Sequence, residues 1–209
     1  RAVILSNNHV LANANDARTG DLILQPGPAD GGRVEDAIAS LSDFVPIHFN
    51  ERRLGVFGRI LQRLLAPVLS WVGFGLKRLP SGRTNLVDAA VADPITPDLV
   101  APNVLGIGRI RGTVEPSIGM QVRKSGRTTG NTAGRLTAVD AVVEVDYGGK
   151  TAIFRQQVVS DIVSQGGDSG SVIVDERDRG VGLLFAGSAT TTLINPMNAV
   201  AQFLDLSLD

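Results

Sequence analysis

Short runs of valine, isoleucine and leucine alternate along this chain with turn-forming residues, and this pattern restricts the fold more than any other feature of the sequence. The chain has 24 glycines and 10 prolines among 209 residues, which favours an all-β architecture over a helical one. About six strand-like runs lie in the second half, the number that a closed antiparallel barrel requires. These runs cover residues 104–111, 120–124, 134–145, 151–159, 171–174 and 181–185.

The first half holds fewer such runs, and a proline-rich stretch separates it from the second. Extended character is expected at residues 2–5, 21–25 and 44–47. Residues 33–41 fit either a strand or a short helix. Because several prolines interrupt residues 94–103, we expect a linker there, between an N-terminal unit over 1–93 and a C-terminal unit over 104–209.

The C-terminal unit is expected to end in a helix over residues 195–204. Asn195 is a suitable N-cap, because its side chain can accept a hydrogen bond from a free backbone N–H of the first turn. Pro196 suits the first helical position, where its missing N–H has no consequence.

Residues 51–82 do not fit a barrel, because their apolar residues recur at steps of three and four. These apolar residues are Leu54, Phe57, Ile60, Leu61, Leu64, Leu65, Val68, Leu69 and Val72. Arginines lie between them, so the pattern predicts an amphipathic helical insert that Pro67 kinks or ends. The insert contains too many charges for a transmembrane span. It could pack on its own barrel as a helical hairpin, which we favour, or contact a lipid surface, a partner or a second copy of the chain.

A glycine-rich segment near the end of the chain is the best candidate for chemistry. Residues 166–171 read Gly-Gly-Asp-Ser-Gly-Ser and precede an apolar run. A nucleophilic serine needs an open approach, and neighbouring glycines leave room for backbone N–H groups to converge on an oxyanion. This requirement would place the N–H groups of Gly167 and Ser169 around one point. A tight turn before a strand explains the segment equally well when it is taken alone.

A base and an orienting acid for such a serine are available upstream. His9 ends an apolar, strand-like run, and Asp88 is a lone acid in the apolar stretch 85–92. A buried carboxylate needs a hydrogen-bond donor, and an imidazole N–H would supply one. His48 is the other histidine, but it has no acid in a comparable context, so a partly exposed position at a strand end explains it better.

The order His9, Asp88, Ser169, together with the local sequences Ser-Asn-Asn-His, Val-Asp-Ala-Ala and Gly-Asp-Ser-Gly-Ser, resembles the chymotrypsin-like serine peptidases. The resemblance covers roughly residues 1–49 and 83–204 and is nearest to the disulfide-free bacterial and viral branches, since the chain has no cysteine. It implies two antiparallel six-stranded β-barrels. Only eight residues precede His9, so we expect the first barrel to be incomplete and Arg1 to be a cut end.

The resemblance also implies a role for each site residue. Ser169 would be the nucleophile, His9 the base, Asp88 the residue that orients the imidazole, and the N–H groups of Gly167 and Ser169 the oxyanion hole. Asp168 would steady the nucleophile loop. Ser171 stands where the family usually has glycine, a tolerable change beyond the oxyanion hole. The expected activity is serine endopeptidase, with an esterase or a catalytically silent binding module acting through residues 51–82 as alternatives.

The specificity pocket implied by the resemblance has Val163 as its floor. Its remaining lining is Ser164, Phe185, Ala186 and Gly187. Because an apolar floor cannot pair with a cationic side chain, we expect a small or medium aliphatic residue on the acyl side of the scissile bond. A shift in alignment would instead place Asp161 at the floor and favour cleavage after Arg or Lys.

Several other functions find little support in the composition. The formal net charge is −1, so no global field attracts nucleic acid. No Cys/His cluster indicates a metal site, and no cofactor is expected. Residues 125–132 superficially resemble a phosphate loop, but the glycine spacing is wrong and Asn131 replaces the required lysine, so we expect a β-turn with a solvated basic rim. The absence of cysteine is compatible with either a bacterial cytoplasm or export, and the sequence does not decide the compartment.

Overall fold

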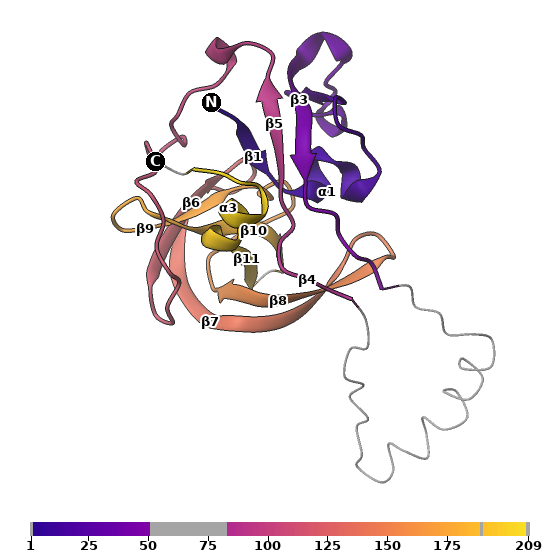
Figure 1. Ribbon diagram of the computed structural model, residues 1–209. Coiled ribbons are helices and arrows are strands. Elements are labelled where there is room, and N and C mark those ends of the chain that lie inside the picture. Colours follow the sequence, from indigo (N-terminus) through magenta and orange to yellow (C-terminus); the bar gives the residue numbers. More distant parts are fainter. Residues whose placement is uncertain (1, 51–82, 189, 208–209) are drawn as a thin grey trace, which may run out of the picture.

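A computed structural model describes residues 2–50, 83–188 and 190–207, which form two β-sheets and a C-terminal helix (Figure 1). The first sheet contains β1 Ile4–Ser6, β2 Leu22–Leu24, β3 Ala37–Phe44 and β5 Ala90–Pro94. The second contains β4 Thr84–Asn85, β6 Gln121–Gly126, β7 Gly130–Asp146, β8 Thr151–Ser160, β9 Val172–Asp175, β10 Gly180–Gly187 and β11 Thr192–Pro196. The α-helices are α1 Asn8–Leu11 and α3 Met197–Phe203. Short 3-10 turns cover Asn13–Asn15, Pro28–Asp30, Val34–Asp36 and Pro97–Leu99.

The first sheet has the strand order β1-β5-β3-β2, and every pair in it is antiparallel. In the described residues, these four strands do not close into a six-stranded barrel. The ambiguous stretch 33–41 divides into the 3-10 turn Val34–Asp36 and the start of β3. The predicted insert at 51–82 lies outside the described residues.

The second sheet closes on itself. Its order is β11-β10-β9-β6-β7-β8, and β11 also pairs with β8, so six antiparallel strands complete a barrel. The short strand β4 adds to the outside of β8 in a parallel direction. The predicted all-β architecture is therefore confirmed, although β4 joins the second sheet from within the expected N-terminal unit.

Two sequence-based assignments in the second half are wrong. Residues 104–111 form no strand, because Gly106 and Gly108 adopt positive φ and turn the chain so that Val104 bridges to Gly108. The sixth barrel strand is instead β11, which contains Asn195. Pro196, and not Asn195, occupies the N-cap position of α3.

Two apolar clusters hold these elements together. One fills the closed barrel and consists of Val122, Leu136, Val158, Ile162, Ile173, Val181, Leu184 and Ile194. The other packs α3 against β10 and the strand that follows Asp88, and consists of Val87, Ala89, Val91, Leu183, Met197, Val200 and Leu204. This second cluster joins the two sheets, so it holds the segment before β5 against the barrel. No helix in the described part of the chain has the length and apolar character needed to cross a lipid bilayer.

Candidate active site

Pairing between β1 and β5 brings His9 and Asp88 together. Ile4 lies opposite Ala92 and Ser6 opposite Ala90, so the chain leaving β1 continues alongside the segment that precedes β5. His9 Nδ1 lies 2.6 Å from Asp88 Oδ2, and the His9 backbone N–H donates to Asp88 Oδ1 at 3.1 Å. These two contacts fix both the imidazole and the carboxylate.

Asp88 is fully buried and is held from several directions. Its backbone N–H donates to Asn195 Oδ1 at 2.9 Å, and its carbonyl accepts from Asn7 Nδ2 at 2.8 Å. The hydroxyl of Tyr147 donates to Asp88 Oδ2 at 2.8 Å. Burial raises the pKa of Tyr147, and the adjacent Asp88 charge and hydrogen bond raise it further, so the phenol keeps its proton. The buried carboxylate therefore has a donor for each oxygen.

The nucleophile segment folds as two consecutive turns. Asp168 N–H donates to Gln165 O at 3.0 Å, and Ser171 N–H donates to Asp168 O at 3.0 Å. The third residue of each turn is a glycine with positive φ, 96° at Gly167 and 85° at Gly170, as a type II turn requires. The glycines flanking Asp168-Ser169 are therefore a backbone requirement of this loop.

The buried Asp168 side chain holds these turns in place through hydrogen bonds. It is fully buried and accepts hydrogen bonds from the N–H groups of Gln165, Thr128 and Thr129, and from the Thr129 hydroxyl at 2.7 Å. Lys124 Nζ completes the environment at 3.3 Å. Burial by itself would raise the pKa of Asp168, but the hydrogen bonds from Thr129, Gln165 and Thr128 lower it well below its usual range.

The β-turn expected over residues 125–132 connects β6 to β7, and its Arg127 and Thr128 are exposed, in agreement with the expected solvated basic rim. The turn packs on the nucleophile loop, and Thr128 Oγ1 also donates to Gly166 O at 2.8 Å. The turn therefore has an exposed rim and also supports the nucleophile loop.

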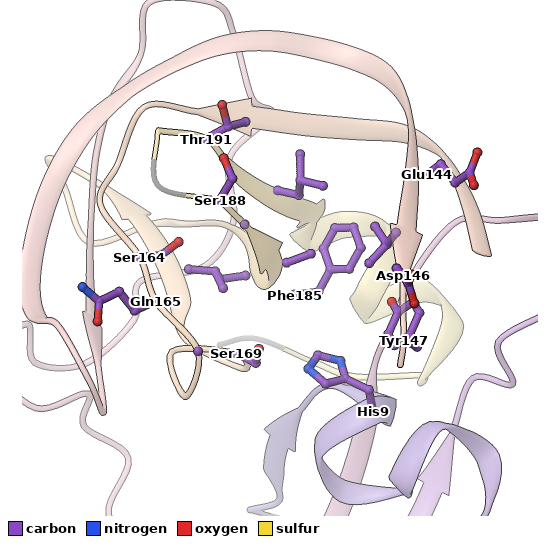
Figure 2. A pocket seen from close by; sticks show the side chains of 16 residues that line it. His9, Glu144, Asp146, Tyr147, Ser164, Gln165, Ser169, Phe185, Ser188 and Thr191 are labelled. Atoms are coloured by element: carbon purple, nitrogen blue, oxygen red, sulfur yellow. The ribbon is translucent and has the colours of Figure 1, made fainter. Parts of the chain in front are cut away.

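Ser169 and His9 line one cavity of about 870 Å³ (Figure 2). No hydrogen bond joins the two side chains in the described residues. The backbone N–H groups of Gly167 and Ser169 have no acceptor within the described part of the chain, whereas those of Asp168, Gly170 and Ser171 are all paired. The two unpaired N–H groups on either side of Asp168 are available to hold an anionic oxygen.

The cavity extends from this point between β10 and the segment before the nucleophile loop. Its lining includes four of the five residues expected to form the pocket, Ser164, Phe185, Ala186 and Gly187. Val163 is not among the lining residues, and it is 53% exposed. Val163 is therefore not the floor. Ser164, one residue later, lines the cavity.

The Ser164 hydroxyl is held by a second hydroxyl group. Ser164 Oγ lies 2.6 Å from Thr192 Oγ1, and Thr192 donates to Ile162 O at 2.7 Å. Because the Thr192 proton is used by Ile162, the Ser164 hydroxyl is the donor to Thr192 and keeps its acceptor capacity toward the cavity. Asp161, the alternative floor, is exposed and accepts from Arg135 N–H, so it lies outside the cavity.

His48, the other histidine, lies away from the cavity. The His48 side chain is exposed, its backbone N–H donates to Asn85 Oδ1, and it does not line the cavity. In the described ranges no three His, Cys, Asp or Glu side chains are grouped to hold a metal ion.

The sequence analysis did not predict the roles of Tyr147, Asn195 and Lys124 around the site. Only Tyr147 carried a signal, as the single tyrosine of the chain beside the Gly148-Gly149 turn.

Comparison with known proteins identifies the fold of the chain. No family model matches the chain, and no curated protein matches it. Among solved structures, the chain resembles Cellulomonas bogoriensis chymotrypsin with a TM-score of 0.55 and 18% identity over 98% of this chain and 84% of that one. A glutamic acid-specific serine protease matches with a TM-score of 0.57 and 14% identity over 99% and 86%. Thermobifida fusca protease A matches with a TM-score of 0.50 and 23% identity over 61% and 70%. The chain therefore has the chymotrypsin-like fold of the bacterial serine proteases.

Proposed function

We propose that this protein is a serine endopeptidase that hydrolyses peptide bonds through an acyl-enzyme. The observation that carries the proposal is that the hydrogen-bonded His9 of the His9–Asp88 pair lines the same cavity as Ser169, which lies in a loop whose Gly167 and Ser169 N–H groups are unpaired within the described residues. The chymotrypsin-like fold supports the same reading, because each of these groups comes from the segment that the resemblance implies.

In the proposed reaction, Ser169 Oγ attacks the scissile carbonyl carbon while His9 Nε2 takes the hydroxyl proton. The electron pair of the carbonyl moves onto its oxygen, which the N–H groups of Gly167 and Ser169 stabilise. His9 then gives its proton to the departing amine as the C–N bond breaks. Water attacks the ester in the same manner and releases the acid and free Ser169. Asp88 keeps the Nδ1 proton of His9 in place and stabilises the imidazolium.

The cavity favours a peptide with a small or medium uncharged side chain on the acyl side. Phe185, Ala186 and Leu193 supply apolar walls, and Ser164 supplies a hydroxyl. In the described lining the acidic residues are Glu144 and Asp146, on the β7 side of the cavity and away from Ser164 (Figure 2). A cationic side chain seated against Ser164 would lack a counter-charge there. Profiling a peptide library by mass spectrometry tests this, and cleavage mainly after Arg or Lys would refute it.

Labelling with a fluorophosphonate probe, followed by peptide mapping, tests the proposed mechanism. Such probes react with a serine only where the base and the oxyanion site both function. We expect one modified residue, Ser169, and no labelling of Ser169→Ala. Ser171→Ala is the matched control, because the Ser171 hydroxyl donates to Asp168 O at 2.6 Å and is already used structurally.

Labelling of the Ser171→Ala variant should persist. A folded protein that stays unlabelled would instead favour the binding-module alternative. Labelling without cleavage of any peptide, but with hydrolysis of simple esters, would favour an esterase.

A further inference from the structure

Tyr147 connects the second sheet to the buried carboxylate of the first. It follows β7 in the four-residue turn before β8, where its N–H donates to Lys150 O at 2.8 Å and Gly148 and Gly149 both adopt positive φ. Asp146 Oδ1 accepts from Gly149 N–H at 2.6 Å and closes the turn. The turn is therefore well ordered by its own bonds, and it directs the phenol toward Asp88.

Aromatic packing holds the Tyr147 ring in place. The ring lies edge-on to the His9 imidazole, with centroids 5.7 Å apart, and edge-on to Phe49 at 5.6 Å. The centroid of the Phe154 ring lies 6.3 Å from that of Tyr147, with the two rings tilted to each other. Figure 2 shows Tyr147 beside His9 at the cavity wall. The ring thus covers the imidazole while its hydroxyl reaches the carboxylate.

Asp88 Oδ2 accepts from two donors, His9 Nδ1 at 2.6 Å and the Tyr147 hydroxyl at 2.8 Å. Two donors on one oxygen share its negative charge, so each one weakens the attraction that the other feels. We propose that Tyr147 is a positioning residue that orients Asp88 and limits the negative charge offered to His9. This inference rests on the proposed protease function for its catalytic meaning, but the contact itself can be tested without activity.

Other charged side chains near the His9 imidazole could also influence its titration. In the described residues, Glu144 and Asp146 of β7 line the same cavity, and Lys150 Nζ lies 5.4 Å from the centre of the Phe49 ring. A substitution at Tyr147 that keeps the aromatic ring leaves these three charged side chains in place. Tyr147→Phe therefore changes one hydrogen bond on Asp88 and no formal charge.

The test is an NMR titration of the histidine ring protons in a Ser169→Ala background. The chain has only two histidines, so the exposed His48 serves as an internal reference. With the phenolic donor removed, Asp88 stabilises the imidazolium more strongly, and we expect the His9 titration midpoint to rise by about half a pH unit or more, a threefold change. His48 should not move.

Two controls separate this effect from packing. Phe49→Leu loosens the ring contact but keeps the hydroxyl, so it should lower the thermal midpoint of unfolding without moving the His9 titration. In an Asp88→Asn background, Tyr147→Phe should no longer raise the His9 midpoint, because the negative charge that the two donors share is gone. An unchanged His9 midpoint in Tyr147→Phe, or an equal shift in Phe49→Leu, would overturn the proposal.

A second measurement covers the case in which Tyr147→Phe does not fold. Tyr147 is the only tyrosine, so biosynthetic replacement by 3-fluorotyrosine alters one side chain. The fluorinated phenol is a stronger donor, and the His9 midpoint should move to lower pH, opposite to the effect of phenylalanine. In the active enzyme, Tyr147→Phe should lower kcat about tenfold with little change in KM. If the fluorophosphonate probe does not label the parent protein, the protease proposal is refuted. The titration result remains a valid test of the Tyr147–Asp88 contact.

Discussion

Lys124 Nζ lies 3.3 Å from Asp168 Oδ2, and both side chains are fully buried directly behind the proposed nucleophile. Lys124 also donates to Gly130 O at 3.1 Å and contacts the Thr129 hydroxyl. The pair leaves no room for a side chain at Gly126, where a Cβ would overlap Asp168 Oδ1. Burial of the two charges is tolerable only because each has several partners.

Lys124→Met should destabilise the protein by about 3–5 kcal/mol, because it leaves the Asp168 carboxylate buried without its counter-charge. The neighbouring Arg123 on the same strand forms an ion pair with Asp178 that is partly exposed, so Arg123→Met should cost about 1 kcal/mol or less. Urea unfolding monitored by circular dichroism gives both values. Equal losses in the two variants would contradict a structural role for the buried pair.

The stability of the protein should fall in acid partly through Asp168. Its pKa is lowered in the folded state, so its contribution is complete above the usual pKa of an aspartate, about 4, and is lost as the pH falls below that value. Unfolding free energies measured from pH 6 to pH 2 should therefore decline less steeply in Asp168→Asn than in the parent. Parallel profiles would show that Asp168 does not contribute to the acid sensitivity.

Ser169→Ala and His9→Ala should each reduce peptide hydrolysis by roughly 10⁵- to 10⁶-fold while leaving the fold intact, and the double variant should lose scarcely more. The effects do not add because the two groups act in one step. His48→Ala is the control and should retain activity. Loss of activity in His48→Ala with retention in His9→Ala would mean that the base has been misassigned.

Gly170→Ala should be strongly destabilising. The φ of 85° is unfavourable for alanine, and a Cβ there would overlap Ser6 Oγ of β1. We expect a loss of about 2 kcal/mol or more. Gly166→Ala, in the same loop, has ordinary φ and open space around the added Cβ, so its stability should change by about 0.5 kcal/mol or less. Thermal unfolding of the two variants provides the comparison.

Deletion of residues 51–82 should leave both sheets folded. Asn50 bridges to Thr151 and Thr84 pairs with Ile153, so the two ends of the segment meet the same strand about 7 Å apart and a short glycine-serine linker can join them. Size-exclusion chromatography and liposome flotation then decide the use of the insert. A truncated protein with the oligomeric state and lipid binding of the full chain would leave only packing against its own barrel.

Local patterns were sufficient for much of the fold. The apolar alternation and turn glycines of residues 134–145 and 151–159 correspond to β7 and β8, and the apolar runs after Ser171 and at Val181 correspond to β9 and β10. Residues 104–111 have a similar composition, yet they form a turn because glycine φ angles, which composition does not reveal, direct the chain. Asn195 has the composition of a helix cap but is a buried strand residue that bonds Asp88 N–H and Gln157.

The sequence by itself determined the candidate chemistry, because a glycine-flanked serine, a histidine just after an apolar run and a lone acid in an apolar run are each recognisable within about ten residues. The structure places that histidine in the short helix α1 that follows β1. Only the tertiary structure decided which groups surround them. Tyr147 reaches Asp88 across 59 positions, Asn195 reaches it across 107, and Lys124 reaches Asp168 across 44. It also decided that Ser164 and not Val163 lines the cavity. Such contacts depend on how the two sheets pack and close, and no short stretch of the chain encodes that geometry.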